Sequence, residues 1–209
     1  MEKPRWRRRK DARPAEIVAA ALDAFAERGY AATRLDDVAT RAGISKGTLY
    51  LYFQSKEELF KAVIRQTVLP NLAEAEKRLA AAEGPTAPLL IELLGGLTAA
   101  AAGRMGIIPK LVIAEAGNFP DLARFYAEEV AARGMALFAR IIARGVERGE
   151  FRALDPRMLA PALAAPILTM ALWKNVLEPH ARVRIDPAAF LATYADLLLG
   201  GLSAPEGKR

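Results

Sequence analysis

Apolar residues recur every three or four positions along most of this chain, the spacing that places them on one face of an α-helix. In residues 14–28, for example, Ile17, Ala21, Ala24 and Phe25 share a face. No stretch alternates apolar and polar residues as a half-buried strand does, and no Asn-Gly or Asp-Gly pair marks a hairpin. The pattern therefore predicts an all-α protein.

Residues that start and stop helices divide this pattern into about nine helices. Three short helices are predicted over 14–28, 33–42 and 46–53, and a longer fourth runs from Ser55 to about Ala82, interrupted at Pro70. Five more are predicted over residues 88–102, 107–116, 121–148, 156–177 and 187–200. This division predicts a basic flexible arm over 1–13, a small domain over 14–60 and a larger helical domain over 61–209.

The second and third helices have the form of a helix–turn–helix. Gly43 can adopt a positive φ and end one helix sharply, and Ser45 is a good N-cap for the next. Side chains that can reach phosphate oxygens or base edges occupy the outward face of the third helix: Lys46, Gly47, Thr48, Tyr50 and Tyr52. Half-buried packing is the alternative for the two tyrosines. Lys46 is the most informative, because a cation at a helix N-terminus opposes the helix dipole unless an external anion relieves it.

The charge is consistent with an acidic partner. The net charge is +6 and the sequence pI is about 9.7. Nearly all of the excess lies in residues 1–65, where Lys and Arg outnumber Asp and Glu by five. Arg5–Lys10 is a basic cluster that contains Trp6. It is either a solvated tail or an arm that lies along phosphates or in a minor groove.

The residue types that are missing weigh against an enzyme. The chain has no cysteine and one histidine, His180, so it lacks the side chains for thiolate metal sites, histidine metal sites and a supported Ser-His-Asp triad. No Walker loop is present, and no G-x-G-x-x-G follows a strand. We therefore expect no catalytic site, no metal and no cofactor.

The hydropathy pattern predicts a soluble, cytoplasmic protein with no membrane segment. The basic N-terminus lacks the apolar region of a signal peptide. The longest notable uncharged run, Met158–Trp173, has sixteen residues and falls short of the ~20 that span a bilayer.

Two stretches of sequence carry a family resemblance. Residues 29–63, GYAATRLDDVATRAGISKGTLYLYFQSKEELFKAV, strongly resemble the tetracycline-repressor (TetR) family of bacterial transcriptional regulators. In the C-terminal part, the segments LVIAEAGNFPDLARFY, IIARGVERGEF and PILTMALW resemble the ligand-binding domain of the AefR-like branch.

The resemblance implies an all-α homodimer that binds a palindromic operator on double-stranded DNA. A small molecule would bind the C-terminal domain and release a repressor from the DNA, although an activator would use the same DNA-binding helices. The apolar composition favours a hydrophobic effector. The DNA contacts that the resemblance implies fall on Thr33, Arg34, Ser45, Lys46, Gly47, Thr48, Tyr50, Tyr52 and Lys56. Arg34 departs from the family, which often has a small hydroxyl residue there.

The same resemblance places dimerisation in the last two helices. The uncharged segments Met158–Trp173 and Phe190–Leu199 suit such an interface, and the alternative is that both belong to the monomer core. Candidate effector-pocket residues are Met105, Glu115, Phe119, Phe125, Phe138, Met170 and Trp173. Ordinary core packing is the alternative for the aromatic and methionine residues, whereas Glu115 either faces a cationic ligand or is exposed or paired with an arginine. A non-specific architectural DNA-binding protein is the competing function class, and it predicts little difference between operator and random DNA.

Overall fold

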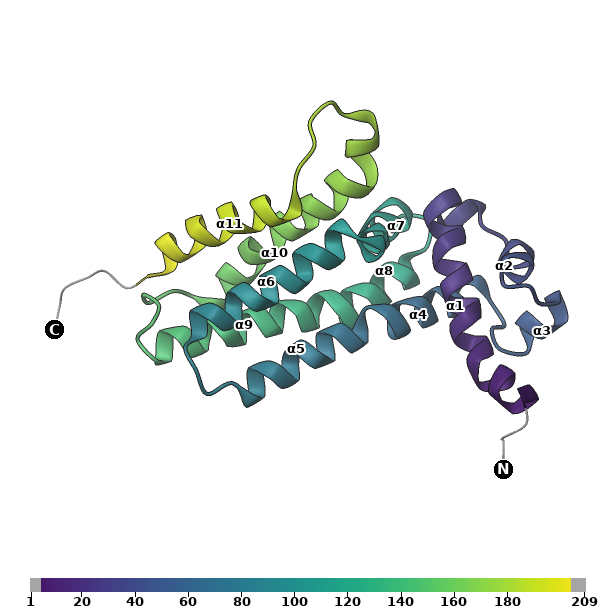
Figure 1. The fold of residues 1–209 in the computed structure, drawn as a ribbon, viewed down its shortest axis with the longest axis horizontal. Coiled ribbons are helices and arrows are strands. Elements are labelled where there is room, and N and C mark those ends of the chain that lie inside the picture. The colour runs from purple at the N-terminus through teal and green to yellow at the C-terminus, as the bar shows by residue number, and fades with distance from the viewer. Residues whose placement is uncertain (1–4, 204–209) are drawn as a thin grey trace. The chain divides into compact units, whose positions relative to one another are not determined.

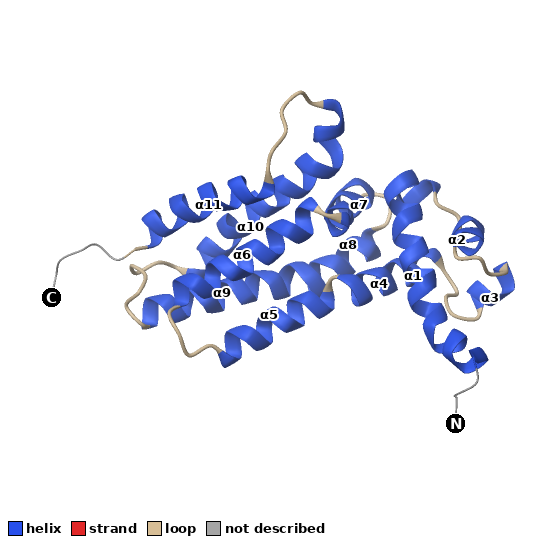
Figure 2. Ribbon diagram, in the orientation of Figure 1, coloured by secondary structure: helices blue, strands red, loops and turns tan. Residues whose placement is uncertain are grey.

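The computed structural model describes residues 5–203, with side chains from residue 14 onward, and these residues form helices and connecting loops without a strand (Figure 2). The α-helices are α1 (Arg5–Ala32), α2 (Leu35–Arg41), α3 (Lys46–Tyr50), α4 (Lys56–Thr67), α5 (Leu69–Ala81), α6 (Thr86–Ala102), α7 (Ile107–Glu115), α8 (Pro120–Tyr126), α9 (Ala132–Glu147), α10 (Pro156–Leu172) and α11 (Pro187–Leu202). Shorter 3₁₀ or π-helical segments are η1 (Arg104–Gly106), η2 (Ala127–Ala131), η3 (Trp173–Leu177) and η4 (Glu178–His180).

The predicted all-α architecture of about nine helices is confirmed. Helices α4 and α5 are separated only by Val68, close to the predicted interruption at Pro70, and α8 and α9 are joined through the π-helical turn η2. With each pair counted as one helix, nine remain among the described residues. The last helix continues through Gly200 and Gly201 to Leu202, beyond its predicted end.

The first helix starts earlier than its sequence pattern predicts. Helix α1 begins at Arg5, whereas Pro14 was the predicted first-turn residue and instead lies inside the helix. Residues 5–13 are mostly Arg, Lys and Ala, which are strong helix formers and extend the helix backwards. The predicted contact of the Arg5–Lys10 side chains with DNA lies outside the described residues. At the other end, Gly29 leaves the helical conformation at φ 79°, directly after the predicted helix end at residue 28.

The chain divides into two compact units, each with its own core. The N-terminal unit comprises residues up to 70 together with residues 111–125, and the C-terminal unit comprises residues 71–110 and 126 onward. The first unit is therefore larger than the predicted domain over 14–60, because a segment from the second half of the chain packs into it.

An aromatic cluster forms the centre of the N-terminal unit. Helix α1 packs against α2 and α4, and α2 packs against α3. The rings of Phe25, Tyr30 and Phe60 lie with centroids 5.3–5.5 Å apart, and all three side chains are buried. Such tilted and edge-to-face pairs add to the free energy already gained by burying the rings. These rings join α1 to α4, and the short helices α2 and α3, which are too short to be stable alone, depend on packing against α1 and against each other.

The C-terminal unit is a bundle in which α9, α10 and α11 lie around α6 (Figure 1). Its larger apolar cluster includes Leu90, Leu94, Phe138, Ile141 and Leu163. A smaller cluster joins Ala101 of α6 to Met170 and Ala171 of α10, and Ile167 packs against both clusters.

Close backbone packing and main-chain bonds hold this unit together. A Cβ added at Gly145 would lie 2.0 Å from the ring of Phe151, so only glycine lets that ring lie against α9. The connector after α9 is tied to the end of α11, because Arg152 donates its main-chain N–H to the carbonyl oxygen of Leu202 at 2.9 Å.

The helical run Pro156–His180 is 25 residues long and apolar enough to cross a membrane by length and composition alone. The uncharged segment Met158–Trp173 was expected to be too short to span a bilayer, but the helix that contains it is longer than that segment. The run packs against α6 and α9, and Ala160, Leu163 and Met170 are buried in the bundle. These contacts place part of the run in the core of the C-terminal bundle.

Candidate nucleic-acid interface

The turn between α2 and α3 is built by local backbone chemistry. Gly43 has φ 66°, in the left-handed region. The N–H groups of Gly43 and Ile44 donate to the carbonyl oxygens of Thr40 and Ala39, which satisfies the last turn of α2 in a Schellman motif. Ser45 then caps α3, because its Oγ accepts a hydrogen bond from the N–H of Thr48 at 3.1 Å. The helix–turn–helix is thus fixed by residues within six positions of one another.

Helix α3 buries Leu49 and exposes Ser45, Lys46, Gly47 and Tyr50. Thr48 and Tyr52 are partly buried. The exposed face therefore combines hydroxyl donors, one cation and a glycine that allows close approach of another molecule. Helix α3 and the residues beside it thus bring together six positions predicted to contact DNA: Ser45, Lys46, Gly47, Thr48, Tyr50 and Tyr52.

Lys46 already has an anionic partner on the protein. Its Nζ lies 2.8 Å from Oδ2 of Asp36, and this hydrogen bond raises the pKa of Lys46. Nζ also lies 5.9 Å from the centre of the Tyr50 ring. Both partners of the ion pair are well exposed, so an external phosphate can exchange with the Asp36 carboxylate.

Leu51, which follows α3, is a residue that the sequence analysis did not single out. It is 84% exposed, the most exposed large apolar side chain among the described residues. Because it lies four positions after Gly47, it continues the exposed face of α3. Sequence alone gives no indication of its exposure, because an isolated leucine at helical spacing is expected to be buried.

Two of the residues predicted to contact DNA make hydrogen bonds within the protein. Thr33 is 1% exposed, and its Oγ1 donates to the carbonyl oxygens of Ala24 at 3.1 Å and Gly29 at 2.6 Å. This side chain secures the end of α1. Arg34 is exposed at the N-cap of α2, and its main-chain N–H donates to Asp37.

Lys56 joins the start of α4 to the end of α1. Its Nζ donates to the carbonyl oxygens of Tyr30 and Ala31, each at 2.8 Å, and lies 4.6 Å from the centre of the Tyr30 ring. Burial lowers the pKa of Lys56, and the negative charge of Glu115 opposes that shift. An ammonium group has three N–H donors, so a third remains for a phosphate while the two carbonyl contacts persist.

The start of α4 is capped by two local hydrogen bonds. Ser55 accepts a hydrogen bond from the N–H of Glu58 at 3.0 Å, and the Glu58 carboxylate accepts one from the N–H of Gln54 at 2.7 Å. The second bond reaches Gln54 rather than Ser55, one residue earlier than in an ideal capping box.

Three of the predicted effector-pocket residues lie in the N-terminal unit. Glu115 accepts a hydrogen bond from the N–H of Ala31 at 3.1 Å. Phe119 packs edge-on against Tyr30, with centroids 4.9 Å apart. Phe125 is buried, with Lys61 and Arg65 near its ring face. The structure thus assigns these side chains to packing against α1 and α4.

The other four predicted pocket residues lie in the C-terminal unit, but in different places. Phe138 belongs to the larger apolar cluster and Met170 to the smaller one. The sulfur of Met105 lies 3.5 Å from the side-chain nitrogen of Asn71. Trp173 is partly buried at the start of η3. The seven predicted residues are therefore divided between the two units, three in the N-terminal unit and four in the C-terminal unit.

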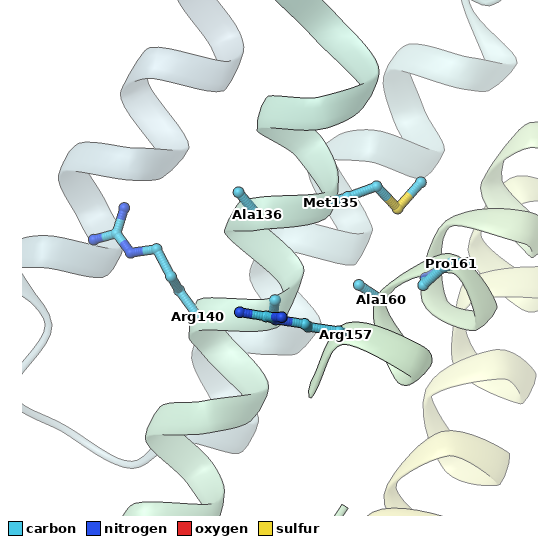
Figure 3. Close-up of a pocket in the computed structure, with 7 residues that line it drawn as sticks. Met135, Ala136, Arg140, Arg157, Ala160 and Pro161 are labelled. Atoms are coloured by element: carbon cyan, nitrogen blue, oxygen red, sulfur yellow. The ribbon is translucent and has the colours of Figure 1, made fainter. Parts of the chain in front are cut away.

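A shallow pocket of about 380 Å³ opens between α9 and α10 in the C-terminal unit. Figure 3 shows the side chain of Arg157 reaching from α10 toward α9, and that of Met135 reaching from α9 toward α10. Ala136, Ala139, Arg140, Ala160 and Pro161 complete the lining. None of the predicted effector residues is among them.

Comparisons with known proteins agree with this geometry. Residues 17–63 match the model of bacterial regulatory proteins of the tetR family, and residues 82–185 match that of the tetracyclin repressor-like C-terminal domain. YfiR from Bacillus subtilis strain 168, an HTH-type transcriptional regulator, is 30% identical over 149 residues, covering 70% of this chain and 72% of that protein. The HTH-type transcriptional repressor KstR2 from Rhodococcus jostii is 27% identical over 198 residues, 94% of each chain.

A solved structure extends the likeness to nearly the whole fold. The transcriptional regulator FadR from Bacillus subtilis, in complex with stearoyl-CoA, matches with a TM-score of 0.69 at 20% identity, covering 90% of this chain and 98% of that one. Regulators of this type are not enzymes; they bind operators and small molecules and act as dimers. With its exposed α3, its capped α4 and matches to both domain models, the chain belongs to the TetR family of helix–turn–helix transcriptional regulators.

Proposed function

We propose that this regulator is a homodimeric repressor that reads a palindromic operator through α3. The observation that carries the proposal is the exposed face of α3, where a cation, hydroxyl groups and a glycine lie together beside the ordered turn. Phosphate and base contacts are assigned to Ser45, Lys46, Gly47, Thr48, Tyr50 and Tyr52. Arg34 and the third N–H of Lys56 add phosphate contacts, and Thr33 holds the end of α1 from inside.

Leu51 extends this contact surface with an apolar group. The major-groove edges of the base pairs carry one apolar substituent, the C5-methyl group of thymine. A leucine that is 84% exposed at the end of α3 is suited to that methyl group. We therefore include a thymine in each half-site, opposite Leu51.

Dimerisation is assigned to α10 and α11. Large apolar side chains are exposed on both helices, with Met158 72%, Leu168 40% and Leu197 71% exposed. Burying them against a second copy would remove these apolar surfaces from water. One short recognition helix reads few base pairs, so two copies one DNA turn apart would supply the specificity that a single helix lacks.

A hydrophobic small molecule is proposed as the effector. The core of the C-terminal unit is almost wholly apolar, and FadR, which shares the fold, binds stearoyl-CoA. Binding in this unit would reorient the helix formed by α4 and α5 and change the spacing of the two recognition helices. Such coupling requires that the effector prefer the conformation that cannot bind DNA, and 1–3 kcal/mol of coupling is typical, or about 5- to 150-fold in affinity.

Two finer assignments accompany the proposal. The C-terminal domain is placed in the AefR-like branch on its LVIAEAGNFPDLARFY, IIARGVERGEF and PILTMALW segments. The protein acts in the cytoplasm, where its DNA target lies.

Selection of bound duplexes from a random DNA library, at fixed near-physiological salt, tests the function. We expect a palindromic motif whose enrichment collapses in Lys46→Ala and Tyr50→Ala but persists in Lys77→Ala, an exposed lysine of the C-terminal unit. Binding with no motif, which only weakens as salt rises, would instead identify a non-specific architectural protein.

A further inference from the structure

Four buried polar side-chain atoms in the C-terminal unit make no hydrogen bond among the described residues: Oγ1 of Thr86, Oγ1 of Thr98, Nε of Arg144 and Nε1 of Trp173. Thr86 begins α6, and Arg144 bonds to Gly84 just before it through another nitrogen, whereas Thr98 and Trp173 lie toward the other end of α6 and α10. Thr98 itself is only 2% exposed. Leaving such a group unpaired destabilises a fold, so each unpaired group in a native structure calls for a physical reason.

Other threonines in the helices show that Thr98 is unusual. Thr67, Thr169 and Thr193 each donate to the carbonyl oxygen four residues earlier, at 2.7–3.0 Å. The same acceptor, the carbonyl of Leu94, is available to a threonine at position 98. The Thr98 hydroxyl is not bonded to it and so keeps its hydrogen-bonding capacity.

The two unpaired groups flank one apolar cluster from opposite helices. Thr98 lies one turn before Ala101 on α6, and Trp173 lies one turn after Met170 on α10, while Ala101 and Met170 pack together. Helix α6 also packs against η3, the π-helical segment that begins at Trp173. Segments of this kind inside helices are frequent at functional sites.

The neighbouring polar groups are already paired, which isolates these two. The side-chain nitrogen of Asn175 donates to the carbonyl oxygens of Ala101 and Ala171, at 3.0 and 2.9 Å. The Lys174 ammonium group is paired with the buried carboxylate of Glu178 at 2.5 Å. The Lys174–Glu178 pair therefore offers no free charge to an ionic ligand group.

From these observations we propose that Thr98 and Trp173 form the polar contact of the effector site, and that they bind a carbonyl oxygen on an otherwise apolar, uncharged part of the ligand. An indole N–H can only donate, so its partner must be an acceptor. A threonine hydroxyl can donate to the same oxygen, which has two lone pairs. The small side chains of Ala101 and Ala171 and the flexible side chain of Met170 let an apolar ligand body lie between the two helices. The inference rests on the proposed effector function of this unit.

The first test needs no ligand. Thr98→Val replaces an unpaired hydroxyl by a methyl group of the same shape, so we expect the free energy of unfolding to stay the same or rise. Thr33→Val is the control, because it removes a hydroxyl that is equally buried but is bonded to the carbonyl oxygens of Ala24 and Gly29. That change should lower the free energy of unfolding. A Thr98→Val protein destabilised as much as the Thr33→Val protein would mean that the Thr98 hydroxyl is bonded in the native state, and would overturn the proposal.

The second test uses 2-decanone and decane as a matched pair of probes. Binding is measured by thermal shift, and by tryptophan emission in a Trp6→Phe background, where Trp173 is the one remaining tryptophan. We expect 2-decanone to bind and to shift the emission of Trp173, and Thr98→Val and Trp173→Phe each to weaken it by about three- to tenfold. Decane binding should be the same in all variants.

Equal binding of 2-decanone by the wild type and both variants, or no binding by the wild type, would refute the carbonyl site. Operator binding is measured on the same proteins without probe. A wild-type protein that does not bind an operator would refute the proposed function. The result with 2-decanone would still decide whether the carbonyl site exists.

Discussion

The two units differ in how they treat their buried polar groups. In the N-terminal unit the Thr33 hydroxyl makes two hydrogen bonds, and Ser45 and Ser55 each cap a helix. In the C-terminal unit Thr98 and Trp173 carry buried polar atoms without a partner among the described residues. We infer that the described part of the DNA-binding unit satisfies its buried polar groups without a ligand. The C-terminal unit instead holds buried polar groups that remain able to form a hydrogen bond with a ligand.

Their apolar cores differ as well. The N-terminal unit is centred on the rings of Phe25, Tyr30 and Phe60, which contact one another directly. The C-terminal unit relies on aliphatic side chains and on glycines that admit close neighbours, such as Gly145 against Phe151. The first core should therefore be sensitive to loss of volume, and the second to its addition.

The largest expected effect is the loss of an aromatic ring from the N-terminal core. Phe60→Ala should lower the free energy of unfolding by about 3–5 kcal/mol, because a fully buried ring is removed and leaves a cavity. Phe190→Ala is the matched change in the C-terminal unit, where the ring is half-buried and 6.1 Å from Tyr194. It should cost clearly less. Urea denaturation measures both, and equal losses would remove the contrast between the two cores.

A pair of glycines in α9 tests the C-terminal core. Gly145→Ala places a Cβ against the buried ring of Phe151 and should cost about 1–3 kcal/mol through overpacking. Gly134→Ala in the same helix meets nothing within 4 Å and should stabilise the protein by up to about 1 kcal/mol through helix propensity. Thermal unfolding of both variants shows whether each substitution raises or lowers the stability of the protein. Two changes of the same sign would show that the close approach at Gly145 does not limit packing.

The same contrast separates what the sequence could predict from what it could not. Gly43 and Ser45 act on residues a few positions away, so their predicted roles as helix stop and N-cap follow from local chemistry and are confirmed. Glu115 and Phe119 were predicted to line an effector pocket. Their contacts with Ala31 and Tyr30 join residues more than 80 positions apart, which no local pattern encodes.

The sequence also could not predict in which direction individual side chains point. Thr98 lies in an alanine-rich apolar helix, where nothing distinguishes it from a threonine bonded to its own helix. Leu51 shares its apolar character with the buried Leu49 two positions earlier, and only the fold shows that one is exposed and the other is not. Both residues gained a proposed role only when burial and hydrogen bonds were known.

A smaller effect is expected from Glu178, a buried carboxylate of the C-terminal unit that does have partners. It is paired with Lys174 and accepts the N–H of Ile185 at 3.0 Å. The hydrogen bond from Lys174 lowers the pKa of Glu178. Its contribution to stability is therefore present above the ordinary glutamate pKa of about 4.3 and is lost as the pH falls through the lower pKa of the folded state.

Glu178→Gln should accordingly lower the Tm by a few degrees near neutral pH. The difference from wild type should hold down to about pH 5 and shrink below about pH 4, where the wild-type carboxylate also becomes protonated. Calorimetry across this range provides the measurement. A difference in Tm that does not change with pH would assign the effect to packing rather than to the charge of Glu178.

The smallest expected effect returns to the DNA-binding unit. Lys46 must exchange the Asp36 carboxylate, 2.8 Å away, for a phosphate oxygen when the proposed interface forms. Asp36→Asn removes that competitor and should tighten binding to a random-sequence duplex by about two- to fivefold, the range of an exposed ion pair. Asp196→Asn, an exposed residue of α11, changes the net charge equally and should have a smaller effect. Fluorescence anisotropy at fixed salt compares the two. Equal tightening would show that net charge, and not release of Lys46, governs binding, and Lys46 would then lose its special place among the cations of this unit.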